Sequence, residues 1–202
     1  MKNSDIRNPH CLARAEAAAD EIRMIWSNQT GRPWPRHQKL EFGIILGTGW
    51  GGALQLEEAV EIPLTQLQGF AGLFQLTEIP GHPRELVIGK LCGKWVVCLR
   101  GRIHLNEDPG NRDLFKMVRL QTEMLLQLGV KKFIITAGVG ALPISRFGAL
   151  NDSLRVGDVL AVNSLSTVFA PQMPLWSGEF CPPEDTLSLR LLEIATSVKA
   201  RK

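Results

Sequence analysis

The sequence predicts an α/β fold with a mixed, largely parallel central sheet flanked by helices. Short apolar runs typical of buried strands alternate along the chain with stretches of helical periodicity. The chain has 202 residues, a length that fits one α/β domain. Hydrophobic residues make up 45% of it and charged residues 21%, as in ordinary globular proteins. We therefore expect a single domain over residues 1–202.

The first expected elements are a helix and a buried strand. Apolar residues recur at three- and four-residue steps over residues 10–28, which predicts a helix. The stretch 30–35 contains glycine and proline and breaks it, so residues 1–35 form an N-terminal helix and linker. The apolar run 42–46 ends in glycines, which is typical of a buried parallel strand that enters a loop.

A hairpin and a second helix are expected next. The apolar runs 86–89 and 95–99 flank Cys92-Gly93-Lys94, which indicates two strands joined by a tight turn. Helical periodicity over residues 112–128 predicts a helix, and Gly129 supplies its C-terminal stop.

The last part of the chain predicts two strands and a helix. The apolar run 133–136 predicts another buried strand, and the run 159–162 predicts a further one. Residues 184–200 predict a terminal helix within the segment 184–202. Its acidic start, Glu184 and Asp185, suits the positive end of a helix dipole.

The bulk properties exclude several classes of function. A net charge of +3 argues against a dedicated nucleic-acid-binding surface, which needs clustered basic residues. Four cysteines without a CxxC pair predict neither a disulfide framework nor a metal site. The first ten residues lack an apolar signal segment, and no run of about 18 apolar residues occurs. We therefore expect a cytoplasmic protein without a membrane span.

A glycine-rich string directly follows the run 42–46. In Gly47-Thr48-Gly49-Trp50-Gly51-Gly52, the glycines let backbone N–H groups approach an anion, and Thr48 adds a hydroxyl donor. The string also matches G-x-G-x-x-G. A dinucleotide site, however, needs a helix here and an acidic residue at the end of a second strand about 20 residues later. The acidic stretch 57–61 instead follows a very short helical stretch, so anion binding is favoured, with a tight turn without ligand as the alternative.

A basic string ends the run 95–99. In Arg100-Gly101-Arg102-Ile103-His104, alternation along an extended chain projects Arg102 and His104 together, with Arg100 beside them if the strand continues. The planar donor fork of arginine suits phosphate, and histidine titrates near neutrality. The alternative is a solvated basic strand edge.

Two turns complete the candidates. Residues 79–83 form a proline-rich turn with His82 at its tip, either simply exposed or able to cover a pocket and reach a bound anion. Val156-Gly157-Asp158 precedes the run 159–162, and we expect a turn or capping role for Asp158.

The order and spacing of these strings resemble the trimeric purine nucleoside phosphorylase family, which is grouped with the methylthioadenosine phosphorylases. The likeness covers roughly residues 40–178. The strings that carry it are Ile45-Leu46-Gly47-Thr48-Gly49, Ile79-Pro80-Gly81-His82, 86–94, 100–107, Ile134-Ile135-Thr136-Ala137-Gly138, Leu154-Arg155-Val156-Gly157-Asp158 and Pro174-Leu175-Trp176-Ser177-Gly178.

The resemblance implies an enzyme, a pentosyltransferase of purine salvage. In phosphorolysis, a purine nucleoside and inorganic phosphate give the free base and ribose 1-phosphate. Phosphate is then a co-substrate, and neither a metal nor an organic cofactor is implied. The resemblance also implies a homotrimer that binds nucleoside and phosphate, and from charge and hydropathy we expect no nucleic acid or membrane partner.

The resemblance assigns roles to individual positions. Thr48 stands where the family has a phosphate-bonding Ser or Thr, and Arg102 where it has a phosphate-clamping Arg. His104 matches the histidine at the phosphate and ribose end and His82 the histidine of a mobile loop, so these two are the expected catalytic residues. Gly138 aligns with an Ala whose backbone N–H contacts phosphate. The predicted phosphate-binding residues are Gly47, Thr48, His82, Arg102, His104 and Gly138.

The chain departs from the family in three places. Asn106 replaces a Tyr that packs near the sugar, and two similar strings, 140–142 and 148–150, compete for one family position. The family also continues past the expected helix 184–200 with the residues that recognise the base, so no base-binding residue is predicted. A truncated or catalytically inactive phosphate-binding relative is the alternative hypothesis, and an NAD-dependent oxidoreductase is a third.

Overall fold

The computed structural model falls into two compact units, Met1–Gly138 and Val139–Lys202. The expectation of a single domain stays a prediction. The residues that the structure describes are 9–34, 40, 42–75, 83–104, 107–108, 110–140, 154–164 and 187–198.

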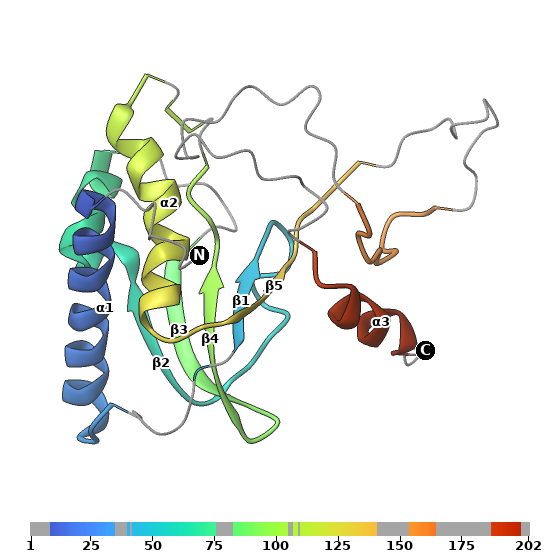
Figure 1. The fold of residues 1–202 in the computed structure, drawn as a ribbon, viewed down its shortest axis with the longest axis horizontal. Coiled ribbons are helices and arrows are strands. Elements are labelled where there is room, and N and C mark those ends of the chain that lie inside the picture. The colour runs from blue at the N-terminus through green and yellow to red at the C-terminus, as the bar shows by residue number, and fades with distance from the viewer. Residues whose placement is uncertain are drawn as a thin grey trace, which may run out of the picture. The chain divides into compact units, whose positions relative to one another are not determined.

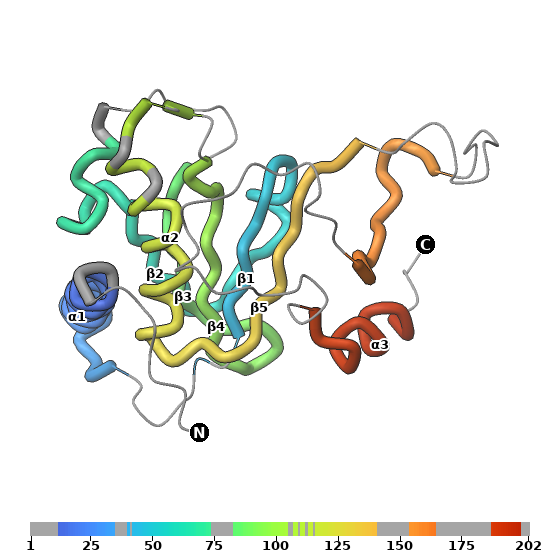
Figure 2. Tube along the Cα trace, turned by 45° about the horizontal axis from the view of Figure 1, so that its top comes forward, coloured from blue at the N-terminus to red at the C-terminus, as the bar shows by residue number. Residues whose placement is uncertain are grey.

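The first unit is a five-stranded sheet with helices against it (Figure 1). The strand order is β2-β3-β4-β1-β5, which Figure 2 shows from a second side. β1 pairs in parallel with β4 and β5, whereas β3 pairs in antiparallel with β2 and β4. The predicted mixed α/β sheet is thus confirmed. Its elements are α1 (Pro9–Thr30), β1 (Phe42–Leu46), β2 (Glu57–Pro63), η1 (Leu64–Gln66), η2 (Gln68–Gln75), β3 (Glu85–Leu91), β4 (Lys94–Arg100), α2 (Arg112–Gln127) and β5 (Lys132–Ile135).

The three inner strands β3, β4 and β1 are buried on both faces of the sheet, where their alternate side chains point to opposite sides. α1 and α2 lie side by side on one side of the sheet (Figure 1). Ile45 of β1 and Val97 and Leu99 of β4 pack in the large apolar core on that side. Their neighbours Ile44 and Leu46 belong to a smaller cluster on the other face, which Trp50, Leu54 and Leu56 help to cover.

Local sequence explains the tight ends of these elements. Cys92 and Gly93 both have positive φ, 51° and 72°, as a two-residue hairpin turn between β3 and β4 requires. The Asn111 side chain accepts the N–H groups of Asp113 and Leu114 and so caps α2. Gly129, at φ 103°, follows the end of α2 as predicted.

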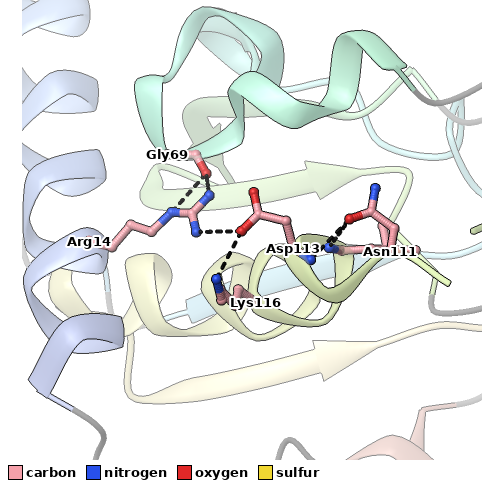
Figure 3. A network of polar contacts seen from close by, with 6 residues as sticks. Arg14, Gly69, Asn111, Asp113 and Lys116 are labelled. Atoms are coloured by element: carbon pink, nitrogen blue, oxygen red, sulfur yellow. Dashed lines mark hydrogen bonds and ion pairs between the residues drawn. The ribbon is translucent and has the colours of Figure 1, made fainter. Parts of the chain in front are cut away.

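A polar network joins α1, η2 and α2 (Figure 3). The Arg14 guanidinium donates to the carbonyl oxygen of Gly69, at 2.5 and 3.1 Å, and its Nη1 lies 3.5 Å from Asp113 Oδ1. Lys116 Nζ lies 3.2 Å from the same oxygen. The pKa of Asp113 is lowered, since burial, the largest effect and one that raises it, is outweighed by the Lys116 hydrogen bond and the Arg14 charge. These ionised side chains therefore connect the start of α2 to α1 and η2.

Three expectations about strands and helices are wrong in part. β5 was expected to be buried, but it is the edge strand, and Ile134 and Ile135 are exposed because no further strand pairs with β5 in the described part of the sheet. Residues 159–162 form no strand and are exposed, since nothing pairs with their backbone among the described residues. The terminal helix, α3 (Leu189–Ser197), starts later than expected, because the Ser188 side chain caps it at Leu191 N. The acidic pair 184–185 lies outside the described residues.

None of the described helices combines the length and the apolar composition that a bilayer crossing demands.

Cys98 should resist alkylation while the protein is folded. Its side chain is buried in β4, and burial, the main cause, raises its pKa to about 11. At pH 8 only about one such thiol in a thousand is ionised, against about a quarter of ordinary exposed thiols, and the thiolate is the reactive form. Iodoacetamide labelling at pH 8, mapped by mass spectrometry, should modify the exposed Cys92 and spare Cys98. Equal labelling of both in native protein would contradict the burial of β4, and denatured protein serves as the control.

Candidate anion-binding site at the carboxyl ends of the parallel strands

Three of the predicted motifs lie at one edge of the sheet. The registers Leu46↔Arg100 and Ile45↔Ile135 align the carboxyl ends of β1, β4 and β5. The chain continues from these ends into the glycine string, the basic string and the segment 136–138. In open α/β sheets, ligands bind outside the carboxyl ends of the strands. The candidate site is therefore this edge.

Gly47 brings the ends of β1 and β5 into close contact. Its N–H donates to Thr136 Oγ1 at 3.0 Å, and Thr136 N donates to the carbonyl oxygen of Ile45 at 2.9 Å. A Cβ on Gly47 would lie 2.5 Å from the Thr136 carbonyl oxygen and 2.9 Å from Ala137 Cα, so only glycine fits. The Gly47 amide is thus committed to Thr136, and its predicted phosphate contact stays a prediction. Sequence reasoning missed Thr136 as the partner.

Thr48 and Gly138 are neighbours at this edge. Trp50 N donates to the Gly47 carbonyl oxygen at 3.1 Å, and Gly49 has φ 83°, so Thr48 lies in a tight turn that needs glycine at its third position. A Cβ on Gly138 would lie 3.9 Å from Thr48 Cβ. Thr48 is exposed at the turn. Thr48 and Gly138 therefore lie next to each other, one after β1 and the other after β5.

The glycine string does not open a helix. Ala53 N donates to the Trp50 carbonyl oxygen at 2.9 Å, which makes a second turn, and the next regular element is the strand β2. A dinucleotide fingerprint requires a helix N-terminus at this point to receive the pyrophosphate. The geometry therefore gives the NAD-dependent hypothesis no support.

The basic string bends at Gly101. Gly101 has φ 77°, its N–H donates to the Leu46 carbonyl oxygen at 3.3 Å, and β4 ends at Arg100. The strand therefore does not continue, and the condition under which Arg100 was expected beside Arg102 is not met. Arg100 instead pairs with Glu61 at 2.9 Å and Glu85 at 3.1 Å. The pKa of Arg100 is raised, because these two carboxylates outweigh burial, the largest effect and one that lowers it.

Arg102 differs from the other arginines described in the first unit. Salt bridges to carboxylates occupy Arg14, Arg23, Arg32, Arg84, Arg100 and Arg119. Arg102 is half-buried and makes no salt bridge with a described carboxylate, while its Nε, like those of Arg84 and Arg100, is buried without a hydrogen-bond acceptor among the described residues. A half-buried charge without a counterion calls for a ligand, an ion or water. Its guanidinium is thus the cation at this edge that the described carboxylates leave unneutralised.

His104 is fixed by a residue that sequence reasoning missed. Its backbone N–H donates to Glu107 Oε1 at 2.7 Å, and Glu107 N donates to the His104 carbonyl oxygen at 3.2 Å. Glu107 Oε2 lies 2.6 Å from Arg84 Nη2, and both side chains of this pair are under a tenth exposed. Arg84 follows the turn of His82 by two residues. The pair therefore connects the start of β3 to the turn of His104 that follows β4.

The remaining candidates are outside the site or outside the described residues. Three of them lie outside the described residues: His82, Asn106, and the competing strings 140–142 and 148–150 with the exception of Gly140. Asp158, in the second unit, accepts Arg155 N at 2.8 Å and donates its own N–H to the Arg155 carbonyl oxygen, so its predicted turn role is confirmed. The described residues contain no cluster of His, Cys, Asp and Glu able to hold a metal ion.

The fold is that of an α/β protein with an open mixed sheet, and the candidate anion-binding site lies at one edge of that sheet. Comparison with curated proteins narrows this class. Purine nucleoside phosphorylase 1 of Geobacillus stearothermophilus is 30% identical over 124 residues, which are 61% of this chain and 39% of that protein. The purine nucleoside phosphorylase of a Cellulomonas species is 28% identical over 198 residues, 95% of this chain and 60% of that protein.

Solved structures agree. A purine nucleoside phosphorylase in complex with ribose 1-phosphate matches with a TM-score of 0.51 at 25% identity, over 73% of this chain and 45% of that chain. The Schistosoma mansoni enzyme in complex with inosine matches with a TM-score of 0.50 at 25% identity, over 72% and 42%. No family model matches the chain. These relatives confirm the resemblance to purine nucleoside phosphorylases over part of the chain, which spans only 39–60% of the curated relatives' length.

Proposed function

We propose that this chain binds inorganic phosphate at the carboxyl edge of β1, β4 and β5 and serves the phosphorolysis of a purine nucleoside. One observation carries the proposal: Arg102 holds a half-buried guanidinium there that no described carboxylate neutralises. Arginine presents a planar fork of donors that matches phosphate. The relatives with bound ribose 1-phosphate and inosine support the same substrate class.

The chemistry follows from holding the dianion in place. A phosphate oxygen attacks C1′ of the sugar, the C1′–N bond to the base breaks, and its electron pair leaves with the purine, which takes up a proton. Phosphate also stabilises the cationic sugar that develops as the bond stretches. Arg102 and the Thr48 hydroxyl orient the phosphate, with Gly138 offering its backbone N–H. His104 and His82 are proposed to complete the phosphate and ribose end.

Phosphate binding should depend on Arg102. A charge-assisted hydrogen bond contributes about 1.5–3 kcal/mol, so Arg102→Ala should weaken phosphate affinity roughly 10- to 100-fold. Isothermal titration of the purified chain with inorganic phosphate measures this. Lys94→Ala is the matched control, because it removes one positive charge from the exposed opposite end of β4 and should leave affinity unchanged. Equal affinities for wild type and Arg102→Ala would refute the site.

Turnover needs a separate assay. Inosine with and without phosphate, followed by release of hypoxanthine, distinguishes the hypotheses for the whole protein. Phosphate-dependent release that is lost in Arg102→Ala supports phosphorolysis. Phosphate binding without release would leave a phosphate-binding relative that does not catalyse, and stabilisation by NAD alone would point to the oxidoreductase.

Assembly and location remain proposals as well. We infer a homotrimer from the family resemblance and propose a cytoplasmic location. Light scattering coupled to size exclusion would test the trimer, and a monomer at micromolar concentration would contradict it.

A further inference from the structure

Gln121 is a buried polar residue on the apolar face of α2. It lies four residues after Met117 and four before Leu125, which both belong to the large core, and it is only 4% exposed. Its Oε1 accepts the N–H of Ile103 at 2.9 Å. Its Nε2 donates to the carbonyl oxygens of Ile103, at 3.4 Å, and Val118, at 3.2 Å. Every donor of the amide and its oxygen are thus used inside the protein.

The Gln121 side chain bonds the backbone of Ile103 in the way that a neighbouring strand would. β4 ends at Arg100, and after the Gly101 N–H, which still donates to Leu46 of β1, the N–H and C=O of Ile103 need other partners. Gln121 bonds both the N–H and the C=O of one residue, as a neighbouring antiparallel strand does. Ile103 itself is buried in the core on the helix side, between the half-buried Arg102 and His104. Both neighbours are thus less buried than Ile103.

A second side chain holds the next peptide. Glu107 Oε1 accepts the N–H of His104, so the two consecutive amides of Ile103 and His104 both end on side-chain oxygens. The peptide that precedes them belongs to Arg102. Fixing these amides restricts the backbone from which the Arg102 guanidinium reaches the edge of the sheet.

We propose that Gln121 is a positioning residue for the phosphate site: through Ile103 it fixes the backbone that carries Arg102 and His104. The proposal rests on the proposed function, since it names what aims Arg102 at phosphate. Gln121 does not contact the anion. Its loss should therefore weaken phosphate binding because the Arg102 guanidinium, although still present, is no longer held in the position that binds phosphate.

The test compares two substitutions on the same face of α2. Gln121→Met keeps the length and the helix propensity of the side chain and removes all three hydrogen bonds. Leu125→Ala is the control, because it destabilises the same helix by opening a cavity and leaves Ile103 bonded. Inorganic phosphate is titrated calorimetrically at a temperature where thermal melts show both variants folded. Amide hydrogen exchange of Ile103 and His104 is measured on the same samples.

We expect Gln121→Met to bind phosphate roughly tenfold more weakly than wild type, as lost support of a binding group typically does. Its Ile103 amide should exchange faster, while Leu125→Ala keeps wild-type affinity. A merely structural role would lower the melting temperature of both variants and the affinity of neither, and that result overturns the proposal.

Two further outcomes are also decisive. If wild type does not bind phosphate, the proposed function fails, and unchanged exchange at Ile103 in Gln121→Met then overturns the positioning role separately. If Gln121→Met does not fold, Gln121→Asn decides: its amide is one methylene shorter, so it cannot keep both hydrogen bonds to Ile103. Affinity roughly threefold weaker is then expected from the lost hydrogen bond, and unchanged affinity overturns the proposal.

Discussion

Gly47→Ala should destabilise the protein by about 3 kcal/mol or more, since overpacking against atoms that cannot rotate away costs at least as much as in a core. The added Cβ would lie 2.5 Å from the Thr136 carbonyl oxygen and 2.9 Å from Ala137 Cα. Both are backbone atoms, so the ends of β1 and β5 must separate. The hydrogen bond from Gly47 N–H to Thr136 Oγ1 would then lengthen or break.

Thermal and urea unfolding measure this loss. For a chain of this size, each kcal/mol lowers the melting temperature by roughly 2–4 °C, so a fall of about 6–12 °C is expected. Gly138→Ala is the matched control at the same edge, because its Cβ would meet Thr48 only at ordinary contact distances of 3.8 and 3.9 Å. A melting temperature for Gly47→Ala equal to that of Gly138→Ala would disprove the close contact of the two strand ends.

The sequence predicted the elements whose apolar side chains are covered by neighbouring elements of the first unit. β1, β3, β4 and α2 each carry an apolar pattern that matches their observed partners. The same reasoning was wrong about the burial of β5 and the strand at 159–162. An apolar run records which side chains favour burial, but not whether a neighbouring element lies against them. Ile135 is 61% exposed for that reason.

β2 was missed, although a signal for it was present. The acidic residues of Glu57–Glu61 hide the alternation of Val60 and Ile62, both of which are buried. Gly89 is a glycine inside a strand pattern, which commonly marks a bulge or a close backbone approach. Here the register shifts between Glu57 and Val60 opposite Gly89, and a Cβ on Gly89 would lie 2.7 Å from Leu56 Cβ. The glycine therefore indicated the neighbouring strand.

The candidate site was predictable where it depends on strand ends and not where it depends on tertiary contacts. The motifs after β1, β4 and β5 meet because parallel strands end at one edge. Gly101, in contrast, ends β4 at Arg100, so the continuing strand that would place Arg100 beside Arg102 is not formed. Glu107 and Gln121 act by accepting backbone N–H groups, which no motif encodes. Only the polar Gln121 within an apolar helical stripe could have indicated a buried contact.

The ion pair between Arg84 and Glu107 leads to the second prediction. Both side chains are almost fully buried, and breaking a buried pair leaves a charge without compensation. Arg84→Met should therefore cost about 3–5 kcal/mol in the free energy of unfolding. Arg84 has φ 50°, and methionine at this position keeps the same backbone strain, so the loss reports the side chain alone.

A double variant separates the effect of the unpaired Glu107 charge from the effect of lost packing. Glu107→Gln removes the carboxylate charge but keeps an oxygen to accept His104 N–H, the contact that measures 2.7 Å in wild type. Arg84→Met combined with Glu107→Gln should therefore recover most of the stability that Arg84→Met loses, because no buried charge remains unpaired. Urea unfolding of the wild type, both single variants and the double variant gives the coupling energy. Surface substitutions change the free energy of unfolding by no more than about 0.5 kcal/mol. If Arg84→Met changes it by no more than this, the ion pair does not hold the turn of His104 against β3.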